Sequence, residues 1–66
     1  MKADIQGALN QIDKSYKAFV HNDKPMTKLQ VKTVLEYGLK KGYKHTGEFT
    51  KEEIDEIIKS LTHAPL

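Results

Sequence analysis

Two helix starts constrain the fold of this chain more than any other feature. Met26-Thr27-Lys28-Leu29-Gln30-Val31 and Phe49-Thr50-Lys51-Glu52-Glu53-Ile54 each place a Thr three residues before Gln or Glu, between two apolar residues. This is a capping box, in which the Thr and the Gln or Glu accept each other's backbone N–H, and the apolar pair packs across it as a hydrophobic staple. Only two such segments occur, so we interpret them as convergent helix starts rather than as a repeat.

The apolar residues behind each start give the extent of the helices. They recur at intervals of three and four residues, which places them on one stripe of an α-helix. The spacing predicts helices over residues 28–41 and 50–62, the first ending at Gly42 in the role of a C-terminal cap. Gly38 falls on the apolar stripe, so we expect a neighbouring element to approach it closely.

The N-terminal third of the chain has the same periodicity and predicts a further helix over residues 4–21. Asp4 is placed to cap its start, and Asn22 and Pro25 follow as a stop signal, because Asn tolerates the left-handed conformation and Pro cannot continue a helix. Residues 63–66 have no periodicity, and we expect them to form a frayed tail.

These segments together predict an all-α fold, a small three-helix bundle formed by a single domain over residues 1–66. A chain this short holds one hydrophobic core, so the apolar stripes of all three helices are expected to share it. The predicted core consists of Ile5, Leu9, Ile12, Tyr16, Phe19, Val31, Val34, Leu35, Leu39, Phe49, Ile54, Ile57, Ile58 and Leu61.

Composition limits the class of protein and its location. The chain contains 38% hydrophobic and 30% charged residues and no Cys, which excludes a disulfide scaffold and a thiolate zinc module. The first residues include Asp4 and lead into no long apolar run, so we expect neither a secretory signal nor a membrane-spanning helix. The expected location is the cytoplasm, with no membrane partner.

Catalytic groups are not arranged for a reaction. Ser15 and Ser60, the two serines, have no His spaced to act as their base. The adjacent carboxylates of Glu52 and Glu53 lie at a helix start, where capping and the helix dipole account for them. We therefore expect a protein that is not an enzyme and has no small-molecule substrate.

Metal ligands are also absent from the pattern. His21, His45 and His63 are too far apart for a helical i, i+4 metal pair. The stretch 42–53 resembles an EF-hand calcium loop in outline, but Lys44 stands where the calcium ion needs an oxygen ligand. We expect no metal and no cofactor.

Apolar residues on the outer side of helix 28–41 predict the functional surface. At about 100° per residue, Leu29, Thr33 and Tyr37 fall opposite Val31 and Leu35. Either the flanking helices cover them, or a partner does, and Tyr is a favoured interface residue. The interpretation is a small protein-interaction module or accessory factor. Its predicted protein-binding residues are Leu29, Thr33, Tyr37, Lys40 and Lys41.

The partner of this surface is either another protein or a second copy of the chain. The acidic start of helix 50–62 offers a complement to the basic helix 28–41 of another molecule, so a homodimer is one expected outcome.

Nucleic acid is the less favoured alternative partner. Six lysines gather on helix 28–41 and its flanking loops, but the chain has no Arg, and the acidic last helix would repel phosphate. The residues of this alternative, weak lysine-mediated nucleic-acid binding, are Lys24, Lys28, Lys32, Lys40, Lys41 and Lys44.

Overall fold

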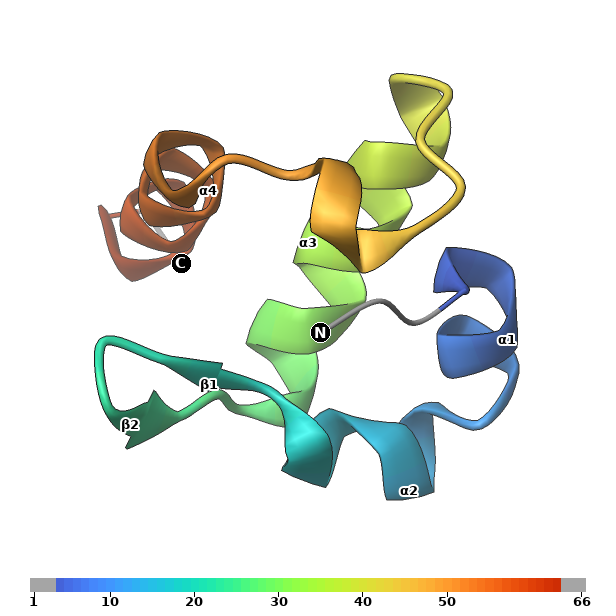
Figure 1. Cartoon of the computed structure of the whole chain (residues 1–66). Helices are drawn as coiled ribbons and strands as arrows, with labels where there is room; N and C mark the ends of the chain where they lie inside the picture. The colour runs from blue at the N-terminus through green and yellow to red at the C-terminus, as the bar shows by residue number, and fades with distance from the viewer. Residues whose placement is uncertain (1–3, 64–66) are drawn as a thin grey trace.

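The computed structural model describes residues 4–63 and shows a mostly helical chain with one short hairpin (Figure 1). Four α-helices, a two-stranded antiparallel sheet and two 3-10 turns occur in this part of the chain, so it is mostly helical but not purely all-α, and the expected three-helix bundle is not confirmed. The elements are α1 (Ile5–Asn10), α2 (Ile12–Ser15), η1 (Tyr16–Ala18), β1 (Val20–His21), β2 (Lys24–Pro25), α3 (Lys28–Lys40), η2 (Thr46–Glu48) and α4 (Lys51–His63).

Both capping boxes form as the sequence predicts. The Gln30 N–H donates to Thr27 Oγ1 over 3.1 Å, and the Thr27 N–H donates to Gln30 Oε1 over 3.0 Å. At the start of α4 the Glu53 N–H donates to Thr50 Oγ1 over 3.1 Å, and the Thr50 N–H donates to Glu53 Oε1 over 3.0 Å. The predicted helices 28–41 and 50–62 therefore differ from α3 and α4 by no more than one residue at either end. The expected tail is wrong at His63, which belongs to α4, and its residues 64–66 lie outside the described part of the chain.

The predicted helix 4–21 is broken into pieces: α1, α2 and η1 cover residues 5–18 with an interruption at Gln11, and its last two residues form the strand β1. Asp4 does cap α1, with its Oδ2 accepting the Gly7 N–H over 3.2 Å, but the chain bends at Gln11 (φ −123°, ψ 35°). A straight helix over 4–21 would be about 27 Å long, against about 20 Å for α3. The bend lets α2 and η1 turn back over α3, and Ser15 Oγ ties the two arms by donating to the Ala8 carbonyl over 2.7 Å.

The hairpin is the second element that the sequence pattern did not predict. Asn22 and Asp23 have φ of 52° and 64°, the pair of positive values that a two-residue type I′ hairpin turn requires. The turn pairs Val20 with Pro25 and His21 with Lys24. The interpretation of Asn22 as a left-handed residue was correct, but it closes a hairpin rather than a helix.

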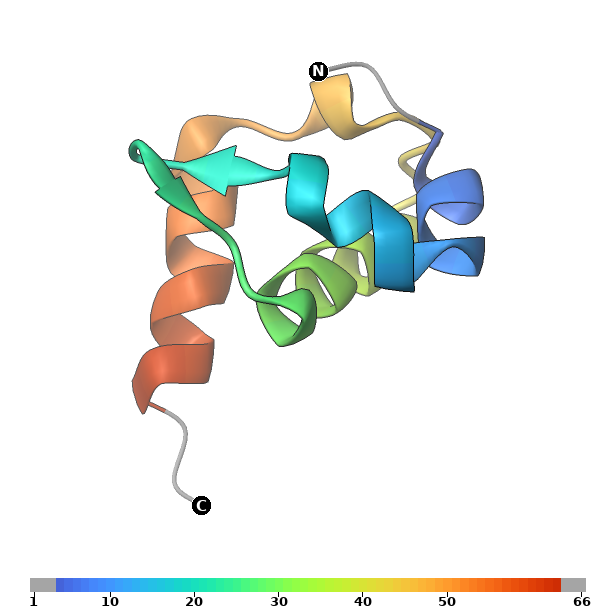
Figure 2. The same cartoon turned by 90° about the horizontal axis from the view of Figure 1, so that it is seen from below.

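Helix α3 lies at the centre, with α1 and α4 on opposite sides of it in both views (Figures 1 and 2). The hairpin, which precedes α3, and η2, which follows it, both lie on one side of α3. Backbone hydrogen bonds join the start of α1 to the loop before η2. The Ile5 N–H donates to the Lys44 carbonyl over 2.9 Å, and Asp4 and His45 form an isolated antiparallel β-bridge. The backbone N–H groups of His45 and Lys44 also donate to the Glu48 carboxylate and lower the pKa of Glu48.

Gly38 is where the chain packs most closely on α3. A Cβ added there would lie 2.4 Å from Phe49 Cζ and 3.1 Å from Ile5 Cδ1. The predicted close approach is confirmed, and the approaching groups are these two side chains. Gly42 ends the helix with φ 87°, and the Tyr43 N–H then donates to the Gly38 carbonyl over 2.8 Å.

The core follows the predicted stripes with one clear exception. Leu39 was expected inside but is 39% exposed. Ala8 and Met26 are buried although the predicted core did not include them. The fully or nearly buried hydrophobic residues are Ile5, Ala8, Met26, Val31, Val34, Leu35 and Ile57.

Candidate functional site

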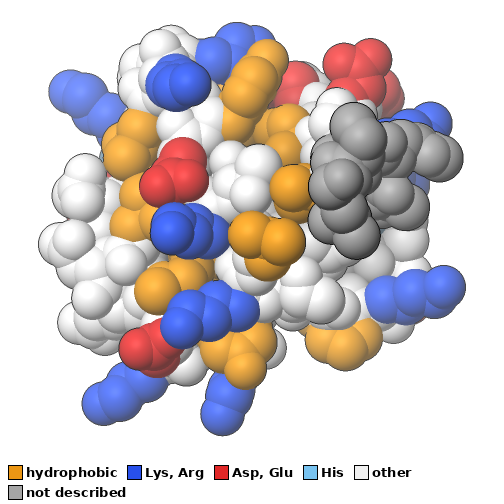
Figure 3. Space-filling view, turned by 180° about the vertical axis from the view of Figure 1, so that it is seen from behind, with side chains coloured by type: hydrophobic (Ala, Val, Ile, Leu, Met, Phe, Trp, Pro, Cys, Tyr) orange, Lys and Arg blue, Asp and Glu red, His pale blue; other side chains and the backbone are white. Residues whose placement is uncertain are grey.

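The surface of α3 that faces away from the rest of the chain carries the predicted protein-binding residues. Leu29 is 63% exposed and Tyr37 is 42% exposed, with the half-buried Thr33 one turn from each. Lys40 is exposed beside them. Figure 3 views the molecule from behind and shows hydrophobic side chains separated by lysines and acidic residues across this side. We call Leu29, Thr33, Tyr37 and Lys40 the outer face of α3.

Lys41, the fifth predicted binding residue, is held by contacts within the chain. Its Nζ lies 2.7 Å from Glu53 Oε2 and also lies over two aromatic rings, 5.4 Å from the Tyr37 centroid and 5.5 Å from the Tyr43 centroid. The Tyr43 hydroxyl donates to the same carboxylate over 2.9 Å. Lys41 therefore links the Tyr37 and Tyr43 rings to the Glu53 carboxylate at the start of α4 instead of presenting a separate charge to a partner.

The ionisation of Glu53 reflects these contacts. Its pKa is lowered from 4.5 to about 2, chiefly because the Lys41 ammonium donates to it, and further because the Thr50 N–H and the Tyr43 hydroxyl do so. The carboxylate in turn raises the pKa of Lys41. Glu53 is the last residue of the EF-hand-like stretch 42–53. Its carboxylate accepts hydrogen bonds from the Thr50 N–H of the capping box and from the Lys41 ammonium group.

The six lysines of the nucleic-acid alternative are spread along the molecule. Lys28 pairs with Asp13 of α2, and Lys41 pairs with Glu53, so two of the six charges are matched by carboxylates. Lys24 lies in the hairpin, and Lys44 lies beyond the far end of α3. Because α3 alone separates these ends by about 20 Å, the lysines do not gather into one compact patch.

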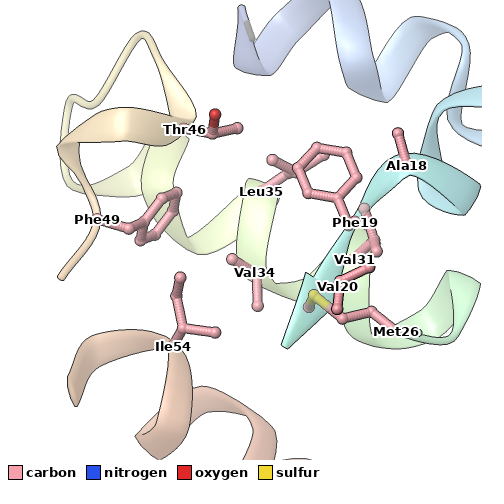
Figure 4. A pocket seen from close by; sticks show the side chains of 10 residues that line it. All are labelled: Ala18, Phe19, Val20, Met26, Val31, Val34, Leu35, Thr46, Phe49 and Ile54. Atoms are coloured by element: carbon pink, nitrogen blue, oxygen red, sulfur yellow. The ribbon is translucent and has the colours of Figure 1, made fainter. Parts of the chain in front are cut away.

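A pocket of about 290 Å³ lies on the opposite, inner side of α3, and the sequence pattern did not predict it. Its walls come from the hairpin side (Phe19 and Met26), from α3 (Val34 and Leu35), from the chain before α4 (Phe49) and from α4 itself (Ile54). Figure 4 shows the side chains directed into one space, with Ile54 extending toward Phe49. Thr46 is the single polar residue among the ten that line the pocket, and none of the ten is charged. The apolar stripes were expected to pack against one another, so the sequence pattern held no signal for a pocket.

The remaining reactive side chains take structural partners. His21 Nε2 pairs with Asp55 of α4, which ties the hairpin to that helix. Ser15 Oγ donates to the Ala8 backbone carbonyl, a structural contact rather than a bond to a base. Among the described residues no group of three His, Asp or Glu side chains is arranged to hold a metal ion. Over the same part of the chain, no helix has the length and apolar character needed to span a membrane.

Comparisons with models of protein families, with curated proteins and with solved structures found no match to this chain. Function is therefore inferred from the two sides of α3.

Proposed function

We propose that this chain is a small cytoplasmic, non-enzymatic protein-interaction module or accessory factor that binds a partner protein through the outer face of α3. The observation that supports this most directly is the exposure of Leu29, 63% on a capped and regular helix. Isolated exposed leucines are ordinary on protein surfaces. Here Leu29 lies on one side of the helix with Tyr37, the spacing at which a helix presents apolar contacts to a partner.

The Tyr37 ring is held in place by its neighbours, and this supports the same proposal. Lys41 lies over the ring, and Glu53 fixes Lys41, so the ring loses less conformational freedom when a partner covers it. A rigid aromatic ring of this kind gives a large contact area at a low entropic cost.

Charge gives the chemistry of the partner. Lys32 and Lys40 are exposed beside the apolar residues, so a complementary surface combines an apolar patch with acidic side chains. Within this chain the acidic start of α4 was the expected complement. Two of its carboxylates, Glu53 and Asp55, already bind Lys41 and His21. The proposal therefore favours a different protein over a second copy.

A photo-crosslinking experiment in the cells that produce the protein tests the proposal. Benzoylphenylalanine replaces Thr33, between Leu29 and Tyr37, and a matched variant carries it at the exposed Lys59 of α4. We expect one discrete protein adduct from position 33 and none from position 59. The substitution Tyr37→Ala should reduce that adduct at least tenfold while leaving the free energy of unfolding in urea within about 0.5 kcal/mol of the parent.

Other outcomes assign the surface differently. An adduct of two copies of this chain would identify self-association, and an adduct with nucleic acid that disappears at high salt would favour the lysine alternative. Equal labelling from both positions, or no adduct from position 33, would contradict the proposal. Unfolding of the Tyr37→Ala variant would show that the ring belongs to the core.

A further inference from the structure

We infer that the pocket on the inner side of α3 binds a neutral, apolar small molecule with one or two rings. This inference does not depend on the proposed function, since the pocket and the outer face lie on different sides of the helix. The pocket is formed by residues from Ala18 to Ile54 and has a volume of about 290 Å³. Ligand pockets in proteins begin at roughly 300 Å³, and an apolar cavity of about 150 Å³ holds benzene.

The chemistry of the walls specifies the class of ligand. Nine of the ten lining residues are apolar and none is charged, so an ionic ligand would lose its hydration without gaining a partner. Two phenylalanine rings, Phe19 and Phe49, come from segments far apart in the sequence and line the same space. Aromatic rings pack favourably edge to face, and the Phe49 ring already packs in this way on Tyr43 at 5.1 Å.

The surroundings of the pocket favour a small molecule over a protein partner. Among residues 4–63 the large hydrophobic side chains that are exposed are Val20, Leu29, Tyr37 and Leu39. Only Val20 lines the pocket, and the other three belong to α3. A stable protein interface needs roughly 1,000 Å² of buried surface with apolar contacts around its centre. The mouth of this pocket lacks such a border, whereas a molecule that fits inside needs none.

The position of the pocket predicts how a ligand would act on the fold. Its walls come from α3, from the segment around the hairpin and from the start of α4, so a bound ring would contact all three. Because a ligand that binds only the folded chain stabilises it, indole should raise the urea unfolding midpoint as its occupancy rises.

Methyl NMR of the full chain with indole as the probe tests the inference. The sequence holds two methionines, Met1 and Met26, and Met26 lines the pocket. We expect indole to shift the methyl signals of Met26, Val34 and Ile54 with one saturable dissociation constant. The methyl signals of Leu29, on the outer face of α3, should not move.

Two variants separate the pocket from non-specific binding. Val34→Leu adds a methylene group at the wall and should weaken indole binding at least tenfold. Ile12→Leu changes a half-buried core residue outside the pocket and should leave the indole dissociation constant unchanged. Should Val34→Leu fail to fold, Ala18→Leu at the exposed edge of the pocket provides the same test.

Three results would overturn the inference. The first is a shift that rises linearly with indole on both sides of α3, which indicates solvent effects only. The second is a set of nuclear Overhauser contacts from the Met1 methyl group to the Phe19 or Phe49 ring in the free protein, which would show that the chain fills its own pocket. The third is a shift of the pocket methyl groups with protein concentration alone, which would assign the pocket to a second copy.

Discussion

The two sides of α3 carry similar apolar side chains in opposite environments. Val31 and Leu35 are 1% exposed on the inner side, whereas Leu29 on the outer side is 63% exposed. Helix periodicity separates the two sets, but it does not say which of them a partner or a ligand uses. The structure shows that the inner side is packed at one end, around Gly38, and open at the pocket, while the outer side has one ordered ring, Tyr37. A buried stripe is therefore not uniformly a packing surface.

The largest expected contrast is between a leucine on each side of the helix. Leu35→Ala removes a fully buried side chain and should destabilise the protein by about 2–5 kcal/mol, since both apolar contacts and a filled volume are lost. Leu29→Ala should change stability by no more than about 0.5 kcal/mol. Urea unfolding followed by circular dichroism measures both free energies. If Leu35→Ala shows no cooperative transition at all, it is the more destabilised of the two variants.

Equal destabilisation by these two variants would contradict the comparison. Leu29 would then be covered in solution, and the crosslinking position at Thr33 would not report on an open surface.

The next contrast concerns the closely packed end of the inner side. Gly38→Ala should destabilise the protein by about 1–3 kcal/mol, even though Ala favours a helix over Gly by about 1 kcal/mol. The added Cβ would lie 2.4 Å from Phe49 Cζ, and the Phe49 ring is held by Tyr43. Glu36→Ala, on the exposed side of the same helix, is the control and should have little effect. A stabilised Gly38→Ala variant would show that Phe49 moves freely.

The features that the sequence predicted depend on neighbouring residues. The capping boxes at Thr27 and Thr50 and the Gly42 cap involve contacts within a few residues, so local chemistry determines them. The close approach at Gly38 was also predictable, because Gly weakens a helix interior and fits an apolar stripe best where a neighbour needs the space of its missing side chain.

The features that were missed depend on distant contacts. The bend at Gln11 accompanies contacts of α1, α2 and η1 with α3, which is distant in the sequence. The turn at Asn22 and Asp23 was interpreted as a helix end because both structures use positive φ. The exposure of Leu39 and the pocket depend on how the elements pack on one another, and helix periodicity contains no information on packing angles.

A smaller effect on stability is expected at the start of α3. Thr27→Ala removes the acceptor of the Gln30 N–H and should cost about 1 kcal/mol, whereas Thr27→Ser keeps the hydroxyl and should recover most of it. Thermal unfolding measures both. An unchanged midpoint for Thr27→Ala would show that the staple residue Met26, and not the hydroxyl, fixes the start of α3.

The last prediction concerns the carboxylate that orders the outer face. The Glu53 pKa is lowered from 4.5 to about 2 by the Lys41 ammonium, so its contribution to stability is complete above pH 4.5 and is lost as the pH falls toward 2. Glu53→Gln keeps an oxygen for the Thr50 N–H, as Gln30 does for Thr27, but removes the charge. The stability difference between the parent and this variant should therefore be constant near neutral pH and shrink between pH 4.5 and 2. Glu56→Gln, exposed on the same helix, is the matched control for the loss of one carboxylate charge. If the difference stays constant down to pH 2, Lys41 does not hold Glu53 in solution, and Tyr37 on the outer face is not preordered by that pair.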